Sequence, residues 1–153
     1  MGKINMGRVL LGGLLAGIII DAFEGVLNGV VLADRMAEYL RSINKPGAFS
    51  TSQLIWFNLI GLAFGIAAVR LYAVARPRFG AGPATAVRAG IALWVIGFLL
   101  PGIINVVGGL APLNLTLIAL AVQIVETVVA ALAGAALYKE SAEPAARAVA
   151  SHA

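Results

Sequence analysis

Residues 9–32 read VLLGGLLAGIIIDAFEGVLNGVVL, and this stretch decides the fold class. A helix needs about 20 apolar residues to cross the roughly 30 Å hydrocarbon core of a bilayer, because each residue adds about 1.5 Å. The stretch is long enough, and only Asp21 and Glu24 in it carry a formal charge. It is therefore predicted to be a transmembrane helix.

Three further stretches have the same length and apolar character. They cover about residues 54–74, 87–110 and 113–138. The link between the last two is so short, around Ala111 and Pro112, that these helices are expected to form an antiparallel hairpin. The sequence thus predicts an all-α fold, an integral membrane four-helix bundle over residues 1–140, followed by a short polar tail at 141–153.

The composition of the whole chain agrees with a membrane location. Of its 153 residues, 61% are hydrophobic and 12% are charged, against about 25% charged in an ordinary soluble domain. The net charge of +4 does not indicate nucleic-acid binding, because the basic residues lie at the ends of the apolar segments. We therefore expect membrane lipids and membrane proteins, and no nucleic acid, as partners.

The distribution of Lys and Arg predicts the orientation, because these residues are enriched on the cytoplasmic side of membrane proteins. Eight lie on the side of the chain ends, namely Lys3, Arg8, Arg70, Arg76, Arg78, Arg88, Lys139 and Arg147. Three lie in the first link, namely Arg35, Arg41 and Lys45. Both termini are therefore predicted to be cytoplasmic, in a cytoplasmic (inner) membrane.

The first link, residues 33–52, is the one sizeable loop of this predicted topology. Apolar residues in it follow the helical spacing i, i+3, i+4 and i+7, at Met36, Tyr39, Leu40 and Ile43. Charged residues occupy the other face, so the link is either a short amphipathic helix on the outer surface or a solvated loop. Ser50 or Thr51 is a candidate N-cap for the second span.

Motifs for enzymes and cofactors are missing from the sequence. The chain contains no Cys, and its one His, His152, lies in the tail. The sequence shows no phosphate-binding loop, no metal-ligand spacing and no nucleophile elbow. We expect neither catalysis nor a bound cofactor or metal.

Three acidic residues lie inside predicted spans, which costs roughly 2.5–3.5 kcal/mol each on insertion scales. They are Asp21 and Glu24 in the first span and Glu126 in the fourth. On a helical wheel, Asn28 shares the face of Asp21 and Glu24. These acids are predicted to point into the bundle and are our candidates for binding an ion or proton.

Amide side chains accompany the acids at similar or more outward depths. With about 1.5 Å of rise per residue, Asn28, Asn58 and Asn105 reach one depth on three different helices, roughly 10 Å outward of the midplane. Gln123 and Thr127 flank Glu126 on its helix face. The pattern predicts a polar pocket that opens to the outer side.

Glycines at four-residue spacing allow helix backbones to approach closely. The candidates for helix packing are Gly13, Gly17, Gly25, Gly29, Gly61, Gly65 and Gly134. Pro101 interrupts the third span and frees the carbonyl of Gly97. Such kinks either are satisfied locally or expose a carbonyl for a ligand.

Two functions are compatible with these features. The first is a non-catalytic accessory or assembly subunit of a larger membrane complex, in which the acids only hold helices together. The alternative is a small proton- or cation-coupled transporter, a homodimer, that uses the three carboxyl groups. A subunit is expected to present a small-residue face such as Gly61 and Gly65 to its partner, whereas a transporter is expected to have a cavity that reaches the acids.

Overall fold

The structure is a computed structural model, and it describes residues 4–139. Lys3, Arg147, His152 and the polar tail at 141–153 lie outside the described residues. The sequence predictions that rest on them therefore stay predictions.

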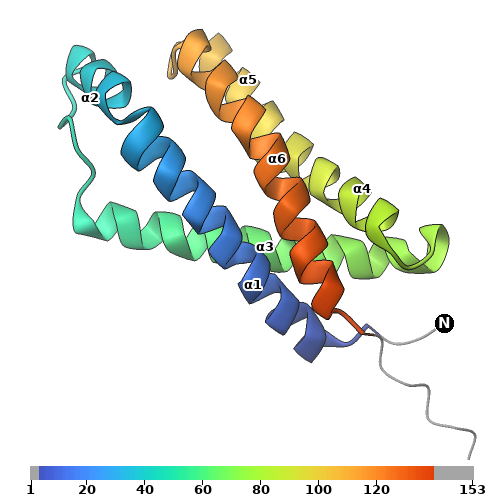
Figure 1. The fold of residues 1–153 in the computed structure, drawn as a ribbon. Coiled ribbons are helices and arrows are strands. Elements are labelled where there is room, and N and C mark those ends of the chain that lie inside the picture. Colours follow the sequence, from blue (N-terminus) through green and yellow to red (C-terminus); the bar gives the residue numbers. More distant parts are fainter. Residues whose placement is uncertain (1–3, 140–153) are drawn as a thin grey trace, which may run out of the picture.

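The described part of the chain contains helices and connecting turns (Figure 1). The elements are α1 (Met6–Val26), the π-helical turn η1 (Leu27–Val31), α2 (Ala33–Ser42), α3 (Thr51–Phe79), α4 (Pro83–Trp94), the π-helical turn η2 (Val95–Leu99), α5 (Leu100–Val107) and α6 (Leu113–Leu137). They form four long apolar spans, Met6–Val31, Thr51–Phe79, Pro83–Val107 and Leu113–Leu137. The predicted all-α fold with four membrane spans is confirmed, and the chain is a small multi-pass membrane protein.

Helix α3, the second membrane span, is longer at both ends than the predicted span of 54–74. It begins directly after Ser50, whose hydroxyl accepts from the Gln53 N–H at 3.3 Å while the Gln53 side chain accepts from the Ser50 N–H at 2.8 Å. This reciprocal capping box satisfies donors at the helix start. At its other end α3 continues through Pro77 to Phe79, beyond the last apolar residues of the predicted span.

The first link contains a helix, α2, so the structure decides between the two alternatives for this segment. Met36 and Tyr39 pack against a small apolar cluster that includes Leu27 and Leu115. The Tyr39 hydroxyl also donates to the carbonyl oxygen of Leu110 at 2.7 Å. A helix of 10 residues has little stability alone, so these tertiary contacts hold it in place.

The bundle is closely packed at one end and splayed at the other (Figure 1). We call these the terminal end, where α1 begins and α6 ends, and the α2 end. The apolar core lies in the half nearer the terminal end and consists largely of small residues such as Ala16, Ala68 and Ala130. Toward the α2 end, α1 and α3 diverge.

Glycines make the close crossing of α1 and α3 possible. A Cβ added at Gly65 would lie against the backbone of Gly17 and Gly13. A Cβ at Gly13 would lie 2.6 Å from the Cα of Ile66. Neither position has space for a side chain, so this crossing depends on glycine.

The third span is not a continuous α-helix. In η2 the N–H of Leu100 bonds to the carbonyl of Val95, a wider turn than in an α-helix. Pro101 follows directly, in the first turn of α5, where its missing N–H costs little. The predicted interruption near Pro101 is thus a π-helical turn.

We expect Gly65→Ala to lower the free energy of unfolding by about 1–3 kcal/mol, because overpacking forces the α1 and α3 backbones apart. Gly25→Ala is the matched control, since a Cβ there meets no atom of the described chain within 4 Å. The measurement is denaturant unfolding of the purified protein in detergent. Equal stability of the two variants would contradict this account of the crossing.

Candidate functional site

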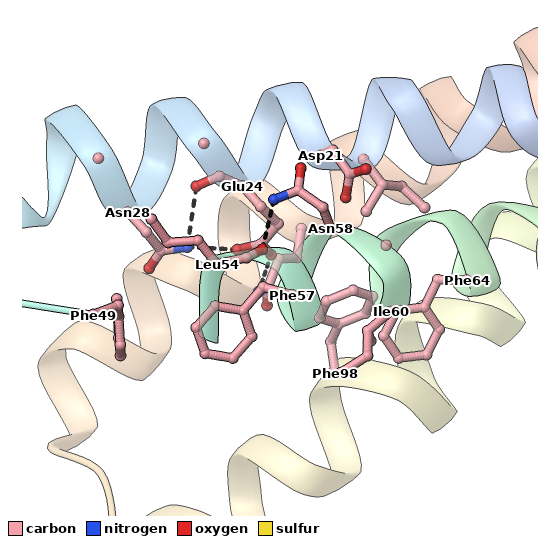
Figure 2. A pocket seen from close by; sticks show the side chains of 15 residues that line it. Asp21, Glu24, Asn28, Phe49, Leu54, Phe57, Asn58, Ile60, Phe64 and Phe98 are labelled. Carbon is pink, nitrogen blue, oxygen red and sulfur yellow. Dashed lines mark hydrogen bonds between the residues drawn. The ribbon is translucent and has the colours of Figure 1, made fainter. Parts of the chain in front are cut away.

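A cavity of about 460 Å³ lies between α1 and α3 at the α2 end (Figure 2). Its polar lining consists of Asp21, Glu24, Asn28, Asn58 and Gln123. We call it the carboxyl cavity. Three helices, α1, α3 and α6, thus contribute polar groups to one space, and no basic side chain lines it. Of the predicted pocket residues, Asn28, Asn58 and Gln123 line this cavity, whereas Asn105 and Thr127 do not.

Both side-chain oxygens of Glu24 accept hydrogen bonds from amide groups (Figure 2). Asn28, one turn along α1, donates to Oε2 at 2.6 Å. Gln123 donates from α6 to Oε1 at 2.7 Å. The second bond joins α1 to α6 across the bundle, so Glu24 is held in position at the wall of the carboxyl cavity.

Asp21 lies one turn before Glu24, against α3. A Cβ added at Gly61 would collide with the Asp21 Oδ1 atom, so the absence of a side chain at Gly61 makes the space that this carboxyl occupies. Gly61 is buried. The glycine that the sequence analysis assigned to helix packing therefore accommodates a carboxyl group.

Two pairs of phenylalanine rings form much of the remaining wall (Figure 2). Phe49 and Phe57 meet edge to face with ring centroids 5.2 Å apart. Phe64 of α3 and Phe98 of η2 have centroids 5.1 Å apart. Aromatic faces and carboxylates both attract positive charge. The cavity therefore has the chemistry to hold a cation that carries apolar groups.

Glu126 lies apart from the carboxyl cavity. Its side chain is 0% exposed, and neither of its oxygens has a hydrogen-bond partner among residues 4–139. The neighbouring Thr127 is also fully buried and donates its hydroxyl to the Gln123 carbonyl of its own helix at 2.8 Å. The structure thus separates Glu126 from the two acids of α1.

A second cavity of about 420 Å³ lies beneath α2. Tyr39, Asn105 and Leu110 line it, and it shares Asn28 and Gln123 with the carboxyl cavity. We call it the α2 cavity. The amide groups that hold Glu24 therefore lie where the two cavities meet.

Apart from Gly61, which faces the Asp21 carboxyl group, the predicted packing glycines fall into two groups. Gly13, Gly17, Gly65 and Gly134 lie within contact distance of other helices. Gly25 and Gly29 have no neighbour that an added Cβ would meet within 4 Å, and they line the carboxyl cavity. These two glycines therefore leave space in the cavity wall, whereas the sequence predicted that they pack against another helix.

The amides predicted at one depth are divided between the two cavities. Asn58 donates to the Leu54 carbonyl of its own helix at 2.7 Å and lines the carboxyl cavity, whereas Asn105 lines the α2 cavity. Asn28 lines both. The polar groups therefore belong to two spaces that share a boundary.

The sequence analysis missed the aromatic wall. Phe57 and Phe64 are seven residues apart on α3, a spacing that puts both on one helix face and was available as a signal. Phe49 and Phe98 come from a loop and a π-helical turn. Nothing in their local sequence indicated that they lie beside the acids.

Among residues 4–139, no group of three or more His, Cys, Asp or Glu side chains lies close enough to hold a metal ion. The fold and the cavity define a small multi-pass membrane protein with a carboxyl-lined cavity. No family model, curated protein or solved structure matches the chain in the comparisons.

We expect Gln123→Leu to destabilise the protein by about 1–3 kcal/mol, because it leaves Oε1 of Glu24 without its donor. The same substitution in a Glu24→Leu background is expected to cost much less, and unfolding in detergent measures both. Asn58→Leu is the control, since that amide bonds only to its own helix. Equal effects of Gln123→Leu in both backgrounds would show that the Glu24–Gln123 bond contributes nothing.

Proposed function

We propose that this protein is a small transporter that binds an organic cation in the carboxyl cavity and exchanges it for protons. One observation carries the proposal: a single cavity combines Asp21 and Glu24 with two phenylalanine pairs. Its volume of about 460 Å³ falls in the range of small-molecule sites.

The charge of the cavity supports a link between cations and protons. Asp21 and Glu24 are one helical turn apart, and no Lys or Arg lines the cavity with them. Two negative charges so close repel each other, and a cation or a proton between them removes this repulsion. Arrival of a cation therefore favours release of a proton, and arrival of a proton favours release of the cation.

The shape of the bundle supports movement across the membrane. The α2 end is splayed and holds the cavity, whereas the terminal end is packed with small residues. This is the form expected of a transporter open to one side. With the orientation that Lys and Arg predict, the open side is the outer side.

The alternative role as an accessory subunit requires a small-residue face that is free for a partner. Gly65 packs against α1, and Gly61 is filled by the carboxyl group of Asp21. Both glycines are used inside the chain, so this face is not available for another subunit. This difference leads us to prefer the transporter.

We expect purified protein in detergent to bind benzyltrimethylammonium and not benzenesulfonate, an anion of similar size. Glu24→Gln is expected to weaken binding at least about tenfold, because a contact to a charged group contributes about 1.5–3 kcal/mol and each 1.4 kcal/mol is a factor of ten. Glu38→Gln, on the exposed face of α2, is the matched control. Calorimetric titration measures the binding of both ligands to the wild-type protein and of benzyltrimethylammonium to both variants. If Glu24→Gln bound benzyltrimethylammonium as tightly as the wild-type protein does, the site would be refuted.

We expect the purified chain, free of other polypeptides by mass spectrometry, to take up benzyltrimethylammonium into proteoliposomes when the lumen is acidic. Protons leaving the lumen then drive the cation inward, and Glu24→Gln is expected to abolish this uptake. Copurification of other polypeptides in fixed ratio, with no uptake by the chain alone, would support the accessory subunit instead.

A further inference from the structure

The carboxyl group of Glu126 is the most isolated polar group in the described part of the chain. It is fully buried in α6, and both of its oxygens lack a hydrogen-bond donor within residues 4–139. Glu24 differs in both respects, since it reaches a cavity and accepts two hydrogen bonds from side-chain amide groups. The two glutamates therefore occupy chemically different sites.

An ionised carboxylate without water or donors is too costly to persist in such a place, so the group stays neutral. The acidic residues on the facing helix α1 are Asp21 and Glu24, and Glu24 is joined to α6 through Gln123. A proton on this carboxyl group removes the need for a counter-charge.

The basic residues of the helices packed against α6 lie toward the terminal end. On α3, Arg70 contacts the sulfur of Met6 at 3.6 Å, and Arg76 lies 5.8 Å from the Tyr138 ring centroid. On α4, Arg88 lies over the ring of Phe79 at 4.9 Å. Arg8 lies in the first turn of α1 and Arg78 in the last turn of α3, so all five basic residues of these helices lie away from the middle of α6, where Glu126 lies.

The polar side chain next to Glu126 on the side of the cavities is that of Gln123. Gln123 is one turn nearer the α2 end on the same face of α6, and it lines both cavities. Its amide is bonded to Glu24 across the interface of α1 and α6. On the other side, Ala130 and Ala131 belong to the packed core. The Gln123–Glu24 hydrogen bond therefore lies on the side of Glu126 that faces the cavities.

We propose that Glu126 is an occluded proton site, distinct from the carboxyl cavity, which exchanges its proton only when the Gln123–Glu24 bond breaks. A cation that engages Glu24 competes with Gln123 for the same oxygen and opens this route. One positive charge then enters the cavity and one proton leaves Glu126 for water, so the charge balances. This use in exchange rests on the proposed function, whereas the occluded site rests on geometry alone.

The test is infrared spectroscopy of protein in detergent at neutral pH, without any cation ligand, during transfer from H₂O to D₂O. We expect the carbonyl-stretch band of a protonated carboxyl group that shifts slowly after the transfer. Glu126→Gln is expected to remove this band, and Glu24→Gln is expected to retain it. A slow band that survives in Glu126→Gln, or the absence of any slow band from the wild-type protein, would overturn the proposal.

A second variant guards against misfolding of Glu126→Gln. Glu126→Asp keeps a carboxyl group at this position. In protein labelled with ¹³C-glutamate, this aspartate is unlabelled, so the slow band is expected to move to the unlabelled frequency. Addition of benzyltrimethylammonium to the wild-type protein is then expected to speed the exchange. An unchanged rate would overturn the coupling to the cavity, and a slow band in protein that binds no cation would refute the proposed function alone.

Discussion

The structure depends on keeping carboxyl groups away from lipid in a helix that must cross the membrane. Asp21 and Glu24 lie within α1, and each is expensive to expose to hydrocarbon. Neighbouring helices meet this demand in different ways. On α3, Gly61 leaves space for the carboxyl group of Asp21, and on α6 Gln123 donates to Glu24. The face of α1 that meets its neighbours is therefore set by these two acids.

Side-chain size along α3 links this constraint to the cavity. Toward the terminal end, Gly65 and Ala68 permit close contact with neighbouring helices, and the small-residue core fills that half. Toward the α2 end, Phe57 and Leu54 take their place beside α1 and line the carboxyl cavity. The same helix pair is thus tight where its residues are small and open where they are large. The acids lie at the transition between the two.

Two carboxyl environments follow from this arrangement. Glu24 has two amide donors and faces a cavity that it shares with aromatic rings, whereas Glu126 has neither donors nor exposure. We infer a division of roles, with the cavity carboxyls binding a cation and the buried one holding a proton. Gln123 lies between the two sites and bonds to Glu24, so one amide group connects them.

The sequence by itself determined the four spans and the inward direction of the acids, because the length of an apolar run and the cost of a charge in lipid are local properties. It left the state of the first link open, since α2 is held by contacts of Met36 and Tyr39 with distant residues. Only the tertiary structure decided that Gly25 and Gly29 border a cavity and that Asn105 belongs to a different space from Asn58. The physical reason is that a helical wheel assumes a constant turn, whereas the π-helical turns η1 and η2 rotate the side chains that follow them. In addition, the divergence of α1 and α3 decides which faces of these two helices meet.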